Sequence, residues 1–317
     1  MSTTSQEPAA LSSAERGKIV IRADLGRAGL ANRLFCWGRA QAAAERYGLP
    51  MLAPQWVKMK IGPILRGERD KRFYLGLFRP EGYVTGPKAW WIQRRYDVIR
   101  ELDFAARLQR AGDPTIVNFF DMVDFFRPIY TDAEVLRRRL WDITAPWVKE
   151  AVDAHRTHVG PVALHVRRGD MPEVAPGQVV NQKTLCQLPT GWFVNVVKSL
   201  QRAHGRDTPV SVFSDGTDEQ LEPILALPNV RRVEGGSALA DIWLMAHAKV
   251  IATSGPSTFG QWAVYLGGSG AVWYPGFRHP ISQECDGAAV DADAEGLLDD
   301  HALATLDAHE RAPLPAG

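Results

Sequence analysis

Short β-type runs alternate with helix-like stretches through the second half of the chain. The β-type runs are 162–166, 209–213, 230–233, 249–253 and 271–274, and the helix-like stretches between them are near 190–204, 217–227, 237–247 and 257–267. Such alternation predicts a mainly parallel sheet with helices on both faces, because strand–helix–strand connections join parallel strands. We therefore expect an α/β fold for this half of the chain.

The first half opens with one strand–turn–helix unit. A short β-rich run at 18–23 leads into a turn that contains Gly26 and Gly29, and apolar residues at helical spacing then extend from Leu30 to a stop at Gly48. Asn32 and Arg33, at the start of this helix, either face a cleft or cap the helix.

Residues 51–155 follow a less regular pattern. Most of the aromatic residues between 56 and 126 are expected in the core, as large aromatic side chains usually are. Residues 131–155 are predicted to be helical, with Thr131 and Glu134 in the spacing of a capping box.

The pattern divides the chain into four segments. Its 317 residues suffice for two ordinary domains, and the regular alternation starts after an interruption at 156–160. We expect a flexible N-terminal lead at 1–16, an N-terminal domain at 17–158, a C-terminal domain at 159–284, and an acidic tail at 285–317 that carries one helix.

Composition excludes several classes of protein. With 37 Lys plus Arg against 36 Asp plus Glu, the net charge of +1 argues against a protein that coats nucleic acid. No apolar run is long enough to span a bilayer, and the first residues lack the apolar core of a signal peptide. Cys36, Cys186 and Cys285 are too far apart to suggest a disulfide framework or a metal site. We expect a cytoplasmic enzyme without a transmembrane segment; peripheral membrane association stays open.

The run from His165 to Asp170 carries the strongest chemical signal. A buried-type strand ends there in His165, Arg167, Arg168, Gly169 and Asp170. Ligands of open parallel sheets bind at the carboxyl ends of the strands, and the planar guanidinium of arginine suits phosphate oxygens. The alternative is an ion pair that caps the strand, although one acid does not neutralise two arginines.

Two further strand ends are rich in polar residues. Asp215 lies in the turn after the strand at 209–213, while Thr217 and Gln220 have the spacing of a capping box. Hydroxyl residues that include Ser257 and Thr258 lie at the start of the helix-like stretch at 257–267. Backbone amides and hydroxyls at a helix N-terminus form an anion site, and a plain N-cap is the alternative.

Several familiar motifs are missing from the sequence. It contains no GxGxxG, no P-loop, no paired acids of the DxD type, and no HExxH, CxxC or GxSxG pattern. We therefore expect no metal and no serine nucleophile.

Four stretches resemble the α-1,2-fucosyltransferases of glycosyltransferase family 11. HVRRGD at 165–170, FSDG at 213–216 and DIWLMAHAKVIATSGPSTFGQWAVYL at 241–266 resemble its three motifs in the same order, and GRAGLANRLFCWGRAQAAAERYG at 26–48 resembles its N-terminal segment. The resemblance implies a GT-B-type fold, in which two Rossmann-like domains face a cleft. It makes the C-terminal domain the donor side and the N-terminal domain the acceptor side.

The resemblance also implies an activity and residue roles. The reaction would be an inverting, metal-independent transfer of L-fucose from GDP-fucose to a hydroxyl of a glycan, as in polysaccharide biosynthesis. Arg167 would hold the β-phosphate of the donor, and Arg168 and Asp170 would shape the same pocket. His165 and Asp215 would lie near the guanosine, and Ser257, Thr258 and Phe259 near the diphosphate. Asp170 and Glu173 are the candidates for a weak catalytic base, although Glu173 also fits an exposed loop acid.

Three places depart from the family pattern, and one of them is Gly255-Pro256, which alters the usual approach to the third motif. Met171 stands where the family often has tyrosine, and Gly216 stands where an acid is common. Because an acid there would pair with the N–H donors of guanine, Gly216 leaves open a GT-B transferase that uses another nucleotide sugar. A non-catalytic nucleotide- or glycan-binding protein of the same fold is the second alternative.

Overall fold

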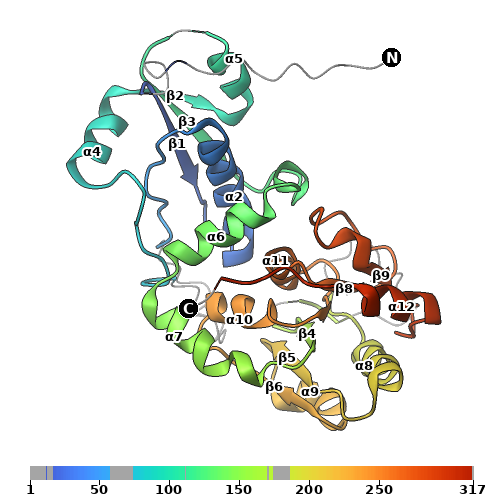
Figure 1. The fold of residues 1–317 in the computed structure, drawn as a ribbon. Coiled ribbons are helices and arrows are strands. Elements are labelled where there is room, and N and C mark those ends of the chain that lie inside the picture. The colour runs from blue at the N-terminus through green and yellow to red at the C-terminus, as the bar shows by residue number, and fades with distance from the viewer. Residues whose placement is uncertain are drawn as a thin grey trace, which may run out of the picture. The chain divides into compact units, whose positions relative to one another are not determined.

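The structure, a computed structural model, describes residue 12 and residues 17–57, 74–110, 112–169, 171–173 and 186–315. The chain divides into two compact units (Figure 1). One unit comprises the described residues up to 58 and from 78 to 129, and the other comprises those from 59 to 77 and from 130 onward. The expected N-terminal lead at 1–16 lies outside the described residues, apart from residue 12.

The first unit contains a three-stranded parallel sheet in the order β1-β3-β2. Its strands are β1 (Ile19–Asp24), β2 (Asp97–Arg100) and β3 (Thr115–Phe120), and its α-helices are α2 (Leu30–Tyr47), α4 (Gly86–Arg95) and α5 (Phe104–Leu108), with short 3₁₀ turns at Glu101–Asp103 and Arg127–Ile129. The predicted strand–turn–helix opening is confirmed. Helix α2 ends at Gly48, whose φ of 59° is the left-handed conformation that glycine adopts most readily.

The second unit contains a six-stranded sheet in the order β6-β5-β4-β7-β8-β9, in which every neighbouring pair is parallel. Its strands are β4 (Val162–Val166), β5 (Val210–Ser214), β6 (Val230–Arg232), β7 (Val250–Ala252), β8 (Gly270–Trp273) and β9 (Ala289–Asp291). The predicted α/β class with a parallel C-terminal sheet is confirmed.

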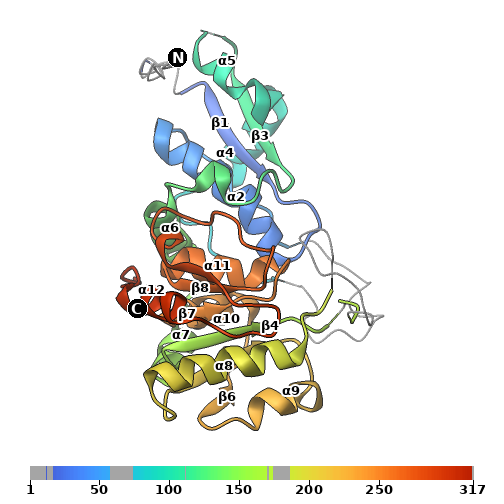
Figure 2. The same cartoon turned by 90° about the vertical axis from the view of Figure 1, so that its right-hand side faces the viewer.

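Helices cover both faces of this sheet. They are α6 (Ala133–Ile143), α7 (Pro146–His155), α8 (Thr190–His204), α9 (Asp218–Leu225), α10 (Ala238–Met245), α11 (Thr258–Gly267) and α12 (Asp300–Ala308), with 3₁₀ turns at Arg156–His158 and Asp286–Ala288. Helices α8 and α9 pack together on one face, and α10 and α11 pack together on the other (Figures 1 and 2). No helix in the described part of the chain is long and apolar enough to cross a membrane.

The helix expected at 131–155 is instead two helices. Thr144 and Ala145 separate α6 from α7, because Pro146 cannot donate the backbone hydrogen bond that a continuous helix needs at this position, whereas the first turn of a new helix accepts it. The capping box expected from Thr131 and Glu134 is also wrong. Asp132 is the N-cap residue of α6, and its side chain accepts no capping hydrogen bond.

The chain passes from the first unit to the second between residues 129 and 130, whereas the sequence pattern predicted a domain boundary near 158. Helix α6 packs against α11, and α7 packs against α10, so both helices belong to the second unit. The buried Arg137 of α6 donates to the carbonyl of Leu266, at the end of α11, and forms an ion pair with Glu284. These contacts join residues far apart in sequence, which a local pattern does not reveal.

The segment expected as an acidic tail also contributes to the sheet. Strand β9 pairs with β8 in register, with Val290 opposite Val272, and α12 packs against β9. The single helix expected in this segment is α12.

Helix α11 lies directly against the central strand β4. A Cβ atom at Gly260 would lie 2.8 Å from Cβ and 2.9 Å from Nδ1 of His165, closer than real side chains approach. By contrast, Gly191 in α8 has open space around the position of a Cβ atom. Close packing therefore requires glycine at position 260 but not at position 191.

We predict that Gly260→Ala lowers the free energy of unfolding by roughly 1–3 kcal/mol, because overpacking outweighs the gain in helix propensity. The matched variant Gly191→Ala should leave stability unchanged or raise it by up to about 1 kcal/mol. Urea denaturation of both variants measures the difference. Equal effects of the two substitutions would contradict the close packing of α11 on β4.

Candidate functional site

Three strand ends of the second unit bring polar residues to one edge of the sheet. Strand β4 pairs in parallel with β5 on one side and with β7 on the other, so the carboxyl ends of all three lie together. Arg167 follows β4 directly, Asp215 follows β5, and Ser254 lies two residues beyond β7. This edge is where ligands bind in open α/β sheets.

Ser254 connects the ends of β7 and β4. Its hydroxyl donates to the carbonyl of His165 over 2.6 Å and accepts the backbone N–H of Arg167 over 2.8 Å. The side chain is buried, so both hydrogen bonds are shielded from water. Ser254 thereby fixes the backbone that presents Arg167.

Asp215 holds the same loop from the side of β5. Its Oδ1 atom accepts the backbone N–H of Arg168 over 2.8 Å, and its Oδ2 atom forms an ion pair with Nη1 of Arg167. The side chains of Arg167 and Asp215 stay 27% and 24% exposed, so the pair lies at the surface of the site. Gly169, with a φ of 22°, passes so close that a Cβ atom there would overlap Oδ2 of Asp215.

Arg168 points into the protein and contacts α8. Its guanidinium donates to the carbonyl of Leu188 and to Oγ1 of Thr190, each over 2.8 Å, and lies 5.9 Å from the ring centre of Phe193. Burial lowers the pKa of the guanidinium, while the carboxylates of Asp215 and Glu173 oppose that shift. Arg168 thus ties the strand end to the start of α8, and its predicted contact with a donor has less support than that of Arg167.

Packing explains why position 216 is glycine and not the acid that the resembled family commonly has there. A Cβ atom at this position would lie 2.8 Å from Cγ of Arg168, and 3.1 Å from the Gln220 side chain. The predicted capping box beside it is confirmed, with Thr217 N–H donating to Gln220 over 2.9 Å and Gln220 N–H donating to Thr217 over 3.4 Å. An acid at 216 would therefore collide with the buried arginine.

His165 is a core residue of β4. It is 5% exposed and stacks on Phe259, with ring centres 5.3 Å apart. Burial, together with the positive charge of Arg167, lowers the pKa of the imidazole to about 3. The ring is therefore neutral near pH 7, and its buried Nδ1 atom has no hydrogen-bond partner among the described residues. Its predicted position beside a guanosine stays a prediction.

Helix α11 begins shortly after the end of β7 in the chain. Ser257 is the N-cap residue and is buried, but its side chain makes no capping hydrogen bond, so the plain N-cap alternative does not account for it. Thr258 and Phe259 are half-buried. Gly255, with a φ of 51°, turns the chain from Ser254 into the helix, and its carbonyl accepts from Gln261 over 3.0 Å.

The N-terminal glycine turn belongs to the first unit. Gly26 has a φ of 58°, and Gly29 is the N-cap residue of α2. Arg33 is fully buried and donates to the carbonyls of Ala28, over 2.9 Å, and Trp56. Arg33 thus holds two loop segments together, while Asn32 is half-buried. The two alternatives for these residues stay predictions.

The two candidate bases follow β4 in the chain. Asp170 lies outside the described residues, and Glu173 is exposed. In the described part of the chain, no group of three or more His, Cys, Asp and Glu side chains is arranged to hold a metal ion.

Sequence reasoning missed the role of Ser254. The cluster of hydroxyl residues before α11 was the signal, but the sequence does not show that one hydroxyl reaches across to β4. Gly169 was likewise part of the motif at 165–170 without an assigned role, and its positive φ and closeness to Asp215 appear only in the folded chain.

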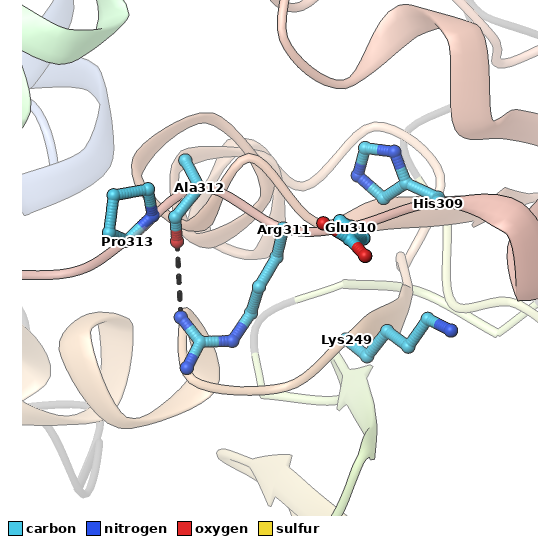
Figure 3. A pocket seen from close by; sticks show the side chains of 6 residues that line it. All are labelled: Lys249, His309, Glu310, Arg311, Ala312 and Pro313. Atoms are coloured by element: carbon cyan, nitrogen blue, oxygen red, sulfur yellow. Dashed lines mark hydrogen bonds between the residues drawn. The ribbon is translucent and has the colours of Figure 1, made fainter.

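One cavity lies at the opposite edge of the sheet. It is lined by Lys249, His309, Glu310, Arg311, Ala312 and Pro313 (Figure 3). Lys249 immediately precedes β7, whereas Ser254 follows it, so this cavity is not part of the site at the carboxyl ends. Its polar groups bond locally: Lys249 donates to the carbonyl of Asp307 over 2.8 Å, and Arg311 donates to that of Ala312 over 3.2 Å.

No protein-family model matches this chain, and no curated protein sequence matches it. The fold is similar to that of fucosyltransferase NodZ from Bradyrhizobium, at 15% identity and a TM-score of 0.45, over 78% of this chain and 92% of that one. It is also similar to POFUT1 in complex with GDP-fucose, at 12% identity and a TM-score of 0.46, over 89% and 99%. A third similar structure is an Arabidopsis thaliana FUT1 variant in complex with GDP, at 12% identity and a TM-score of 0.45, over 80% and 70%. These likenesses assign no residue role to this chain.

The buried imidazole of His165 predicts a pH dependence of stability. Its pKa is lower in the folded chain than in the unfolded chain, so the unfolded state binds more protons below about pH 6.5, and stability falls as the pH falls toward 3. At about pH 5 the loss through this residue is about 2 kcal/mol. We expect His165→Phe to lose correspondingly less stability than the wild type between about pH 8 and about pH 5.

Urea denaturation at the two pH values measures this difference. Burial also lowers the pKa of the half-buried His247 and His279, but both residues titrate in both proteins and cancel in the comparison. His165→Asn serves as a second variant in case the phenylalanine ring does not fit. An unchanged pH dependence in both variants would show that His165 is not held neutral.

Proposed function

We propose that this protein is a glycosyltransferase that moves L-fucose from GDP-fucose to a hydroxyl of a glycan acceptor. The finer proposal is an inverting, metal-independent transfer of the α-1,2 type by a cytoplasmic enzyme. One observation carries it: Arg167, in the motif at 165–170, is held with a partly exposed guanidinium at the carboxyl ends of parallel strands.

The chemistry of the transfer needs a cation at this position. When the bond between the fucosyl carbon and the diphosphate breaks, positive charge grows on the sugar and negative charge grows on the leaving phosphate. A preorganised guanidinium stabilises that developing negative charge, and the N-terminal amides of α11 add a favourable dipole. Arg167 is therefore assigned to the leaving diphosphate, and Ser257, Thr258 and Phe259 to its surroundings.

Asp215 and Ser254 are assigned to positioning. Asp215 holds the guanidinium of Arg167 through the ion pair, and Ser254 holds its backbone through the 2.8 Å hydrogen bond. Because the arginine is already ordered, donor binding does not have to meet the full entropy cost of fixing a long side chain. These two contacts also account for the acid Asp215 after β5 and the hydroxyl of Ser254 after β7.

The acceptor hydroxyl loses its proton during the transfer, so a weak base completes the proposal. Asp170 and Glu173 are the candidates because both follow the strand that presents Arg167. The carboxylate of Glu173 raises the pKa of the buried Arg168 guanidinium and so opposes the effect of burial.

Gly216 favours a second candidate donor. With no side chain at this position, and with Arg168 filling the space around it, an acid that reads guanine is missing there. A GT-B transferase that uses another nucleotide sugar is therefore the alternative, and a non-catalytic nucleotide- or glycan-binding protein is the outcome if a donor binds without turnover.

The donor assignment predicts a selective binding pattern. In a thermal-shift and saturation-transfer panel, GDP-fucose should bind in preference to other GDP sugars and to UDP and dTDP sugars. Arg167→Ala should lower turnover of the bound donor by about 100- to 1,000-fold while the fold survives. Arg156→Ala removes an exposed arginine that is paired with Asp153 in the same unit, and it should leave turnover unchanged. Treatment of the wild type with a chelator should not reduce the rate.

Three outcomes would contradict the proposal in different ways. Preference for a uridine or thymidine donor would support the alternative donor, and near-normal turnover by a folded Arg167→Ala variant would remove the arginine from the mechanism. Loss of activity on chelation, restored by a divalent cation, would refute metal independence alone.

The assignment of a base predicts the effect of Glu173→Gln. If Glu173 accepts the proton of the acceptor, the variant should lose about 100-fold or more in kcat, and the acid limb of its pH–rate profile should shift. Glu150→Gln, at an exposed acid of α7, is the matched control and should retain full activity. Unchanged kcat in Glu173→Gln would leave Asp170 as the candidate.

A further inference from the structure

Helix α4 of the first unit presents two exposed tryptophans. Trp90 is 58% exposed and Trp91 is 50% exposed, whereas Ile92 is the buried residue of this helix. Large apolar side chains are usually withdrawn from water, and exposed aromatic patches mark sites of interaction. The tryptophans therefore need an explanation that the proposed function does not supply.

The same helix carries only positive charge. Lys88, Arg94 and Arg95 are exposed, and the sequence from Gly86 to Arg95 contains no acidic residue. Trp90 and Arg94 lie one turn apart on one face, with the Arg94 guanidinium 4.5 Å from the centre of the Trp90 ring. The cations and the aromatic rings thus share the exposed side of the helix.

The helix is firmly seated on its own unit. Ile92 packs into a cluster with Val20, Leu52 and Ile116, and Ala89 and Tyr96 pack against that cluster. At 3.6 residues per turn, Trp90, Trp91 and Arg94 point away from the side that Ile92 occupies. The exposed face is therefore held in place before any partner binds.

We propose that the exposed face of α4, formed by Lys88, Trp90, Trp91, Arg94 and Arg95, binds the surface of an anionic phospholipid bilayer. Tryptophan rings favour the boundary between water and hydrocarbon, because one part of the ring is apolar and the indole N–H is polar. Arginine and lysine beside them match the negative surface of such a bilayer. The helix lies on the membrane in this arrangement, with its axis in the plane of the surface.

Charge decides between this partner and a neutral glycan. Exposed tryptophans also stack on sugar rings, but one face of Trp90 is covered by Arg94, and a neutral sugar carries no charge that complements three cations. An anionic surface uses both features at once. A soluble acidic polysaccharide is the remaining competitor, and the experiment separates it from a bilayer.

The test is co-sedimentation of the full chain with vesicles. We expect binding to vesicles of phosphatidylcholine mixed with phosphatidylglycerol, weaker binding to phosphatidylcholine alone, and loss of binding as salt is added. Arg94→Gln with Arg95→Gln should lower the partition coefficient by about 30-fold, from about 1 kcal/mol for each cation. Trp90→Ser with Trp91→Ser should lower it by at least about tenfold.

Two matched controls probe exposed residues of the same unit outside α4. Arg127→Gln removes a cation that is paired with Asp124, and Leu102→Ser removes an apolar side chain that is 84% exposed between Glu101 and Asp103. Both should bind vesicles as the wild type does. Thermal unfolding of every variant confirms that the fold is retained.

The proposal is overturned if the wild type does not sediment with the anionic vesicles, or if the tryptophan pair is replaced without loss of binding. Equal binding to both kinds of vesicle would overturn the role of the cations. Binding to heparin without binding to vesicles would identify a soluble polyanion in place of the bilayer. The proposed donor site belongs to the second unit and α4 to the first, so failure here leaves the proposed function intact.

Discussion

The backbone that follows β4 depends on two side chains from neighbouring strands. Beyond Val166 the sheet no longer supplies acceptors for the N–H groups of Arg167 and Arg168, and buried N–H groups need partners. Ser254 accepts the first and Asp215 accepts the second, each over 2.8 Å. These two hydrogen bonds end the strand in a defined conformation and so determine where the adjacent side chains point.

Close approach is the second constraint at this edge of the sheet. Gly169 passes against Asp215, Gly216 lies against the stem of Arg168, and Gly260 lies against His165. At each position a Cβ atom would overlap the neighbouring side chain. The packing of this chain therefore accounts for glycine at position 216.

Much of the fold follows from local sequence patterns. The alternation of apolar runs predicted β4 to β8 and the helices between them, because strand and helix periodicity depends on near neighbours in the chain. The Thr217–Gln220 capping box and the end of α2 at Gly48 were predictable for the same reason. The N-cap at Asp132 and the pairing of β9 with β8 depended on which of several permitted local structures the tertiary contacts favour. The interruption of the helix at Thr144 has a local cause instead, because Pro146 cannot continue a helix.

By itself the sequence determined which residues follow the strands: Arg167 and Arg168 after β4, Asp215 after β5, and the hydroxyl residues after β7. Only the tertiary structure decided which of them stays accessible. Arg167 remains partly exposed beside Asp215, while Arg168 is buried against Leu188 and Thr190, although the two arginines are adjacent and identical in chemistry. Adjacent side chains in extended backbone point in opposite directions, and whether each meets solvent or protein depends on segments that are distant in the chain.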